Sequence, residues 1–231
     1  MKQLVKALFR LVGLDLVRYD QGYKEREALH AKYKEFTMVS LPSFTLNLEL
    51  CNSFRHLSGD YVECGVWRGG MSAAIAELLG PERMVHLFDS FEGLPLAKEI
   101  DGKEALAWQR NTTSPGYFDN CSAEEAYVMN AMSLAGHSHY RTYKGWFDQT
   151  LPTFGDHSIA ILRLDGDWYD SIMTCLEHLF PKVVQGGIVL LDDYYTWDGC
   201  AKAVHDYLSK NRAPSRVHQW KNGVAYLVKK G

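Results

Sequence analysis

Cysteine is scarce in this chain and is not arranged for cross-linking or zinc binding. The five cysteines are scattered, their number is odd, and no two of them form a C-x-x-C pair. This pattern excludes a disulfide framework and a zinc knuckle, and it fits free thiols in a reducing compartment. We therefore expect a cytoplasmic protein.

Long apolar runs and clusters of positive charge are absent as well. No apolar run approaches the roughly 20 residues that span a bilayer, and Arg10 and Asp15 interrupt the apolar part of an N-terminus that otherwise resembles a signal peptide. The net charge is −3, and no long basic run is present to neutralise phosphates. We expect a soluble protein that binds neither membranes nor nucleic acid.

What is present suffices for one domain with a full core. The 231 residues are 46% hydrophobic, which fits a single α/β domain over residues 1–231. Residues 1–57 are interpreted as an N-terminal helical extension, in which residues 2–18 have the spacing of an amphipathic helix that packs on the domain or on a second subunit. We expect a homo-oligomer.

Residues 97–138 form a turn-rich segment with several aromatic residues. Long irregular insertions in compact domains are typically lids or binding loops, so we interpret this segment as a lid or acceptor-binding insertion. A plain surface excursion would have the same composition and remains the alternative.

Two apolar segments of strand length carry carboxylates at their ends. Ile159–Leu164 and Ile188–Leu191 are continuous apolar runs, typical of a parallel sheet that is buried on both faces. Between them, Ser171–Val184 has the length of a crossover helix, closed by Gly186-Gly187. In a right-handed βαβ unit both strand ends lie at one edge of the sheet. The carboxylates that meet there are Asp165, Asp167, Asp192 and Asp193.

This carboxylate group has two interpretations. An Asp after a strand often caps a helix or supports a turn, which would make these residues structural. Carboxylates that lie this close repel one another, so a cation or shared protons must stabilise them if they form one site. Ligands bind at this edge of open α/β sheets, and we therefore favour a divalent cation site.

A glycine turn follows the strand that begins near Tyr61. Gly65, Gly69 and Gly70 let a ligand approach the backbone, and the helix that starts near Gly70 offers free N–H groups. The spacing is not G-x-G-x-x-G, so a pyrophosphate site is not indicated. Asp89, 24 residues after Gly65, ends the next strand, where it would accept hydrogen bonds from ribose hydroxyls or cap the following turn. Together these features indicate a nucleoside cofactor without a pyrophosphate.

Four motifs resemble the macrocin and mycinamicin O-methyltransferases. They are E-C-G-V-W-R-G-G, F-D-S-F-E-G-L-P, G-W-F-D-Q-T-L-P, and L-R-L-D-G-D-W-Y-D-S through G-G-I-V-L-L-D-D-Y, in order over about residues 38–210. The resemblance implies a metal-dependent enzyme of antibiotic biosynthesis that transfers a methyl group from S-adenosylmethionine to a sugar hydroxyl. The expected acceptor is a small molecule, a glycoside or a sugar nucleotide.

The resemblance also implies roles for individual residues. Asp165, Asp192 and Asp193 resemble the metal ligands, and all-oxygen ligation favours Mg²⁺ or another hard divalent cation over zinc. Asp167 resembles the general base, with His139 as a second candidate. The expected cofactor-binding residues are Glu63, Gly65, Arg68, Gly69, Gly70, Asp89 and Ser90. Arg68 would balance the methionine carboxylate or else point to solvent.

The predicted fold is the class I S-adenosylmethionine methyltransferase arrangement. It has a Rossmann-like parallel sheet with helices on both faces, extra N-terminal helices, and a C-terminal antiparallel hairpin. The tight-turn pair Asn222-Gly223, between strands near Val217–Trp220 and Val224–Val228, predicts that hairpin.

Two other functions compete with methyl transfer. A metal-dependent hydrolase would use the carboxylates to activate water, but the ligands for a two-metal centre are missing from the motifs. A non-catalytic nucleoside-binding module would leave the four aspartates without a task. Binding of S-adenosylmethionine separates the transferase from the hydrolase.

Overall fold

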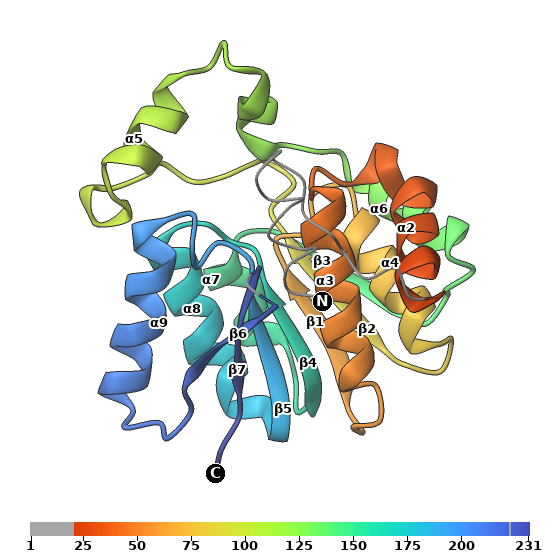
Figure 1. Ribbon diagram of the computed structural model, residues 1–231. Helices are drawn as coiled ribbons and strands as arrows, with labels where there is room; N and C mark the ends of the chain where they lie inside the picture. Colours follow the sequence, from red (N-terminus) through yellow and green to blue (C-terminus); the bar gives the residue numbers. More distant parts are fainter. Residues whose placement is uncertain (1–20, 222) are drawn as a thin grey trace, which may run out of the picture.

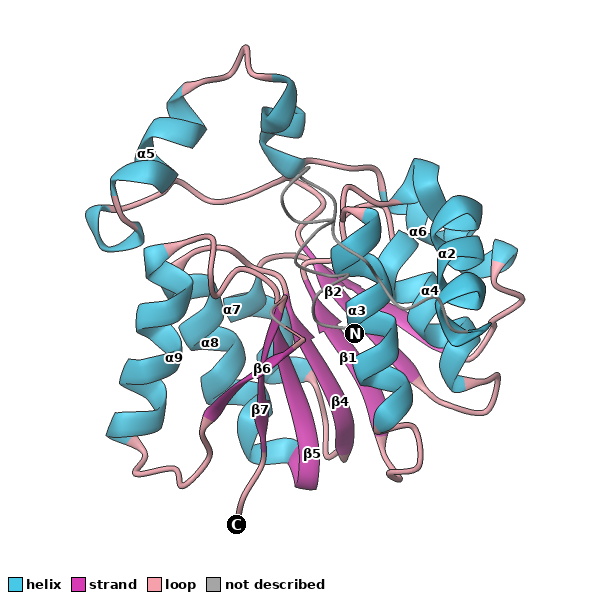
Figure 2. Ribbon diagram, viewed as in Figure 1, coloured by secondary structure: helices cyan, strands magenta, loops and turns pink. Residues whose placement is uncertain are grey.

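A seven-stranded sheet with helices on both faces forms the frame of the molecule (Figures 1 and 2). The computed structural model describes residues 21–221 and 223–231, so the helix predicted for residues 2–18 lies outside the described part. The strands are β1 Asp60–Cys64, β2 Val85–Asp89, β3 Tyr140–Lys144, β4 Ile159–Leu164, β5 Val183–Leu191, β6 Val217–Trp220 and β7 Val224–Val228. The α-helices are α2 Gln21–Tyr33, α3 Leu41–Ser53, α4 Gly70–Leu79, α5 Lys103–Arg110, α6 Glu125–Leu134, α7 Phe147–Thr150, α8 Tyr169–Leu179 and α9 Asp198–Lys210. The short 3₁₀ helices are η1 Lys34–Phe36, η2 Glu99–Asp101, η3 Pro115–Cys121, η4 Leu151–Thr153 and η5 Phe180–Lys182.

The strands lie in the order β3-β2-β1-β4-β5-β7-β6. All neighbouring pairs from β3 to β5 are parallel, and β7 is antiparallel to both β5 and β6. The predicted α/β class, with its parallel strands and its C-terminal antiparallel hairpin, is therefore confirmed.

Each face of the sheet has its own apolar core. Helices α2, α3, α4 and α6 cover one face, and α7, α8 and α9 cover the other (Figure 1). Side chains alternate between the faces along each strand, so Ile161 packs with the first group while the neighbouring Leu162 packs with the second. This double burial explains why β4 reads as an unbroken apolar run.

Two expectations from composition can be compared with the fold. All five cysteines are free, and four of them are buried. None of the helices in the described ranges is long and apolar enough to cross a membrane.

The crossover between β4 and β5 is shorter than predicted. Helix α8 begins at Tyr169 and ends at Leu179, five residues before the predicted end at Val184. Pro181 cannot continue a helix because it has no N–H to donate, and β5 starts at Val183 and runs through the two glycines that were expected to close the helix. The predicted strand Ile188–Leu191 is therefore the second half of a longer strand.

The segment 97–138 passes over the carboxyl edge of the sheet (Figure 1). It contains η2, α5, η3 and α6 in succession. In η3, the residues from Phe118 to Cys121 all have positive φ angles, between 50° and 61°. Four consecutive left-handed residues without glycine are costly, and such strain clusters at functional segments.

Candidate active site

A pocket of about 650 Å³ opens at the carboxyl edge of the parallel strands, within the size range of small-molecule sites. Segments that follow β1, β2, β4 and β5 line it, and residues 36–43 and Gly93–Pro95 border it. The predicted site residues among its lining are Glu63, Gly65, Asp89, Ser90, Asp165, Asp167, Asp192 and Asp193. The structure thus brings together all four aspartates of the two strand ends.

A buried arginine, whose role the motifs did not reveal, lies among these carboxylates. The side chain of Arg163, in β4, is 1% exposed, and its Nη1 lies 2.6 Å from Glu63 Oε1 and 2.8 Å from Asp165 Oδ2. Its Nη2 lies 2.6 Å from Asp192 Oδ1. Burial alone would lower the pKa of Arg163, but the facing carboxylates, led by Asp192, outweigh it and hold that pKa well above its ordinary value. Arg163 therefore ties the ends of β1, β4 and β5 together as a fixed positive charge.

Asp165, Asp167 and Asp193 form the closest carboxylate group. One oxygen of each lies within 4.8 Å of the others. Burial raises the pKa of Asp165 to about 8, although Arg163 opposes the shift, and burial raises the pKa of Asp167 to about 7. Burial and repulsion from Asp167 and Asp165 raise the pKa of Asp193 well above its ordinary value. A group of carboxylates that resists ionisation in this way is a group that a bound cation would stabilise.

The neighbouring residues Asp192 and Asp193 face different partners. Asp192 pairs with Arg163, whereas Asp193 Oδ2 accepts a hydrogen bond of 3.2 Å from the backbone N–H of Asp167. Side chains alternate in direction along a strand, and these two residues directly follow β5. As a result, Asp193 joins Asp165 and Asp167 in the closest group. Asp192, the other expected metal ligand at this strand end, forms an ion pair with Arg163 beside that group.

Asp167 is held from both its backbone and its side chain. Its φ angle is +57°, a left-handed conformation that non-glycine residues rarely adopt. The indole Nε1 of Trp197 donates a hydrogen bond of 2.8 Å to Asp167 Oδ1, which partly offsets the effect of burial on the pKa of Asp167. Trp197, which the motifs did not point to, thus orients the candidate base.

The glycine turn lies against the carboxylate turn. Gly65 has φ +85°, and a Cβ there would lie 1.7 Å from the carbonyl oxygen of Asp165, so only glycine fits. The carboxylate of Asp89 accepts hydrogen bonds of 2.7 to 2.8 Å from the backbone N–H groups of Val66, Trp67 and Phe91. A carboxylate has about four acceptor positions, so Asp89 shapes the turn and keeps capacity for one further hydrogen bond.

Glu63 and Ser90 are also engaged within the protein. Glu63 is buried and accepts hydrogen bonds from Tyr61 at 2.6 Å and from Ser72 at 2.5 Å, besides its ion pair with Arg163. Ser90 Oγ donates to the carbonyl of Gly93 and accepts from the backbone N–H of Glu92, both at 3.0 Å. Both residues line the pocket, and both help to build its wall.

Arg68, Gly69 and Gly70 do not line the pocket. The guanidinium of Arg68 lies over the rings of Trp67 and Tyr127, 4.5 and 4.6 Å from their centroids, and so stacks between them instead of facing a methionine carboxylate. A Cβ on Gly70 would lie 2.6 Å from the backbone of Phe36, and one on Gly69 would lie 3.1 Å from Val128. These two glycines therefore allow close packing against Phe36 and Val128, and their approach to a ligand stays a prediction.

His139 lies at the wrong edge of the sheet for catalysis. It directly precedes β3, at the amino edge, and its Nδ1 lies 3.2 Å from the carbonyl oxygen of Glu82. Asp167 follows β4 at the carboxyl edge. The structure therefore separates the two candidate bases, and His139 is not retained as one.

Comparison with known proteins adds a family to this geometry. The profile of the macrocin O-methyltransferase (TylF) family matches residues 49–228. The chain is 37% identical over 180 residues to an 8-demethyl-8-(2,3-dimethoxy-alpha-L-rhamnosyl)-tetracenomycin-C 4'-O-methyltransferase of Streptomyces olivaceus, with 74% of this chain and 67% of the relative covered. It is 33% identical over 184 residues to the mycinamicin III 3''-O-methyltransferase of Micromonospora griseorubida, with 76% of this chain and 71% of the relative covered.

Solved structures agree with this result. The O-methyltransferase NovP superposes with a TM-score of 0.67 at 28% identity, over 89% of both chains. A calicheamicin methyltransferase superposes with a TM-score of 0.62 at 20% identity, over 92% of this chain and 94% of the other, which shows a shared fold.

The sheet order, the two helical layers and the pocket at the carboxyl edge define a class I methyltransferase fold. The chain belongs to the macrocin O-methyltransferase family and is an O-methyltransferase, as the four motifs predicted. A hydrolase receives no support from these comparisons, and a non-catalytic binding module does not fit membership of this enzyme family.

Proposed function

We propose that this enzyme transfers the methyl group of S-adenosylmethionine to a hydroxyl of a sugar moiety or related small molecule, with Asp167 as general base and a hard divalent cation, Mg²⁺ in the first place, at the carboxylates. The observation that carries the proposal is the group of Asp165, Asp167 and Asp193, whose oxygens lie within 4.8 Å of one another beside the glycine turn.

The donor atoms fit a hard cation. The acidic side chains around Arg163 outnumber that single guanidinium, since Glu63, Asp165 and Asp192 already contact it while Asp167 and Asp193 lie beside them. All of these donors are carboxylate oxygens, which suit Mg²⁺ better than zinc. Asp165 and Asp193 would hold the ion, with Asp192 placed beside them by Arg163. A cation bound there would lower the pKa of an acceptor hydroxyl by several units.

Asp167 is suited to remove the hydroxyl proton. In the in-line displacement, the C–O bond forms as the C–S bond of the sulfonium breaks, and the proton of the hydroxyl must leave. Trp197 occupies Asp167 Oδ1, so Oδ2 remains to accept that proton. Burial raises the pKa of Asp167 in the metal-free protein, and a cation bound beside it would favour the ionised carboxylate that accepts the proton.

The cofactor would bind where the glycine turn meets the pocket. Gly65, Asp89 and Ser90 line that part of the pocket, and Asp89 keeps one acceptor position for a ribose hydroxyl. One relative is named as a methyltransferase of a rhamnosyl tetracenomycin, which supports a glycoside as acceptor. Two neighbouring hydroxyls, one at the cation and one at Asp167, would satisfy both parts of the site.

The test is transfer of labelled methyl from S-adenosylmethionine to a panel of glycosides with vicinal hydroxyls, with Mg²⁺ or with a chelator. Asp167→Asn keeps the acceptor for Trp197 but cannot take a proton, so we expect turnover to fall by about 10²- to 10⁴-fold, while calorimetry finds cofactor affinity nearly unchanged. The matched control is Asp156→Asn, a carboxylate on the surface far from the pocket lining. Failure to bind S-adenosylmethionine, or full turnover in Asp167→Asn, would contradict the proposal.

A further inference from the structure

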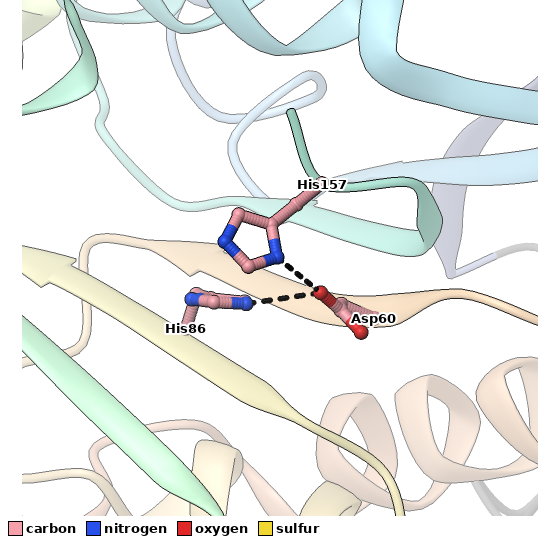
Figure 3. A group of neighbouring side chains, drawn as sticks. All are labelled: Asp60, His86 and His157. Atoms are coloured by element: carbon pink, nitrogen blue, oxygen red, sulfur yellow. Dashed lines mark hydrogen bonds and ion pairs between the residues drawn. The ribbon is translucent and has the colours of Figure 1, made fainter. Parts of the chain in front are cut away.

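A second group of metal-ligand side chains lies at the amino edge of the sheet, at the opposite end of the strands from the pocket (Figure 3). Asp60 begins β1, His86 lies near the start of β2, and His157 is in the segment that leads into β4. In the register of the sheet, Val62 pairs with His86, so Asp60, two residues before Val62, shares the face of His86. The fold therefore gathers three residues that are far apart in the sequence.

One ring nitrogen of each histidine is directed at the same carboxylate oxygen. Asp60 Oδ2 lies 3.0 Å from His86 Nε2 and 3.0 Å from His157 Nδ1, and Figure 3 shows both rings directed at that oxygen. Ligands bound to zinc at about 2.0–2.2 Å lie roughly 3 Å or slightly more from one another. These side chains need only small movements to hold an ion.

The surroundings of His86 also suit a metal. Its side chain is buried, and its Nε2 faces Asp60. The other ring nitrogen, Nδ1, lies 3.0 Å from the hydroxyl of Tyr143, whose oxygen can accept a hydrogen bond from Nδ1–H when Nε2 binds a metal. Metal-binding histidines typically have such a partner for the second nitrogen.

Access and nearby charge define the kind of site. The side chains of His157 and Asp60 are 42% and 21% exposed, so an ion can enter and water can complete its coordination. Phe154 stacks on the ring of His157 with centroids 4.9 Å apart and fixes its orientation. Two positive side chains lie near the group: Arg83 interacts electrostatically with Asp60, and Arg141 with His86. Their charge repels a dication and limits its affinity for the site.

We propose that Asp60, His86 and His157 bind a divalent transition-metal ion, Zn²⁺ in the first place, in a site that is separate from the carboxylates of the pocket. Two imidazoles and one carboxylate favour Zn²⁺, whereas the all-oxygen donors of the pocket favour Mg²⁺. The ion would fasten the segment before β4 to the starts of β1 and β2. Its role is structural, because the reacting groups lie at the other edge of the sheet.

The experiment uses the full chain, freed of metal with a chelator and kept in excess Mg²⁺ so that the pocket carboxylates are occupied. Zn²⁺ is titrated by calorimetry, and Co²⁺ is added as a spectroscopic probe, since visible ligand-field bands report nitrogen and oxygen ligation. We expect one Zn²⁺ per chain and, at a hundredfold excess over the dissociation constant, a melting temperature that rises by about 5 °C.

Variants locate the ion. His157→Ala changes an exposed side chain and is expected to weaken Zn²⁺ binding by more than about 100-fold, beyond the loss typical for a mere supporting partner. Tyr143→Phe keeps the ring stacked on Phe88 but loses the hydroxyl, and it should weaken binding by about 10- to 100-fold. The control His56→Ala removes an exposed histidine outside the group and should bind Zn²⁺ like the parent.

A pocket variant, tested alone and combined with His157→Ala, distinguishes the proposed Zn²⁺ site from the pocket carboxylates. Asp193→Asn removes a pocket carboxylate and should leave Zn²⁺ binding intact, whereas Asp193→Asn combined with His157→Ala should lose it. No binding to the parent chain, or equal binding to His157→Ala and the parent, would overturn the proposal and leave a hydrogen-bonded His-Asp-His group only. Loss of binding with Asp193→Asn alone would overturn it as well, by placing the ion in the pocket.

Discussion

At the residue scale, Arg163 decides whether the carboxylates can lie together. It is the positive side chain in contact with Glu63, Asp165 and Asp192, and it is buried. The aspartates could be predicted from the sequence because they follow apolar runs at strand ends. The signal for Arg163 was its presence inside the run I-A-I-L-R-L, since a buried arginine needs acidic partners. Which partners it takes depends on side-chain directions that the sequence does not encode locally.

We expect Arg163→Met to destabilise the enzyme strongly. The substitution keeps an apolar stem but leaves buried carboxylates without their counter-charge, which costs about 3–5 kcal/mol. Urea unfolding in the absence of metal measures the loss. Lys98→Ala, which breaks an exposed pair with Asp170, is the control and should leave the unfolding midpoint unchanged. Equal midpoints for both variants would contradict the role of Arg163.

Replacing Trp197 tests whether its hydrogen bond sets the pKa of Asp167, the proposed base. Its hydrogen bond to Asp167 Oδ1 stabilises the ionised carboxylate and lowers its pKa. Trp197→Phe removes the donor, so the pKa of Asp167 rises and the acidic limb of the pH–rate profile moves to higher pH, by about one unit. Trp168→Phe is the control, because the Nε1 of Trp168 donates to the carbonyl of Pro95 instead. A profile that does not move for Trp197→Phe would exclude the tuning role.

At the scale of elements, the strands and the C-terminal hairpin followed from sequence pattern, but boundaries and insertions did not. β5 extends back to Val183, which pairs with Ile159, and the two glycines lie in the irregularity of register before pairing resumes at Ile161 and Ile188. Glycine inside a strand often marks such a bulge. His139 directly precedes β3, and in a parallel sheet such a residue lies at the amino edge, away from Asp167.

The insertion over the pocket is expected to select the acceptor. The ring of Trp108, in α5, lies 6.1 Å from that of Trp168 and 6.0 Å from that of Trp197. Aromatic pairs of this kind contribute about 0.5–1.5 kcal/mol each and hold α5 against Trp168 and Trp197. Trp108→Ala should loosen the segment over the pocket and thereby raise the KM for the acceptor, by about tenfold. Cofactor affinity, measured by calorimetry, should stay the same, and Trp108→Phe should restore most of the loss. An unchanged KM would make the segment a plain surface excursion.

At the scale of the whole molecule, the crowded carboxylates link folding to pH. Asp165 and Asp167 keep their protons up to about pH 8 and 7 in the folded protein, whereas in the unfolded chain they release them near 3.8. Between these limits the folded state holds more protons on these two carboxyl groups, so we expect their contribution to the stability of the metal-free protein to fall as the pH rises from about 4 to 8.

Urea unfolding at several pH values, in the presence of a chelator, checks this dependence. Mg²⁺ should restore stability at pH 8, because it replaces the lost protons as the counter-charge. In Asp167→Asn, which cannot titrate at that position, the decline between pH 4 and 7 should be shallower than in the parent. A parent whose metal-free stability rises over this range would refute the assignment.

The contact between Gly65 and Asp165 limits how such an enzyme diversifies. A side chain at residue 65 would collide with the carbonyl oxygen 1.7 Å from its Cβ, so the two turns are fused at one fixed spacing. The spacing between the glycine turn and the carboxylates is then fixed by this contact. Changes in acceptor specificity then have to arise in the segments that border the pocket, while the two turns at its base keep their positions.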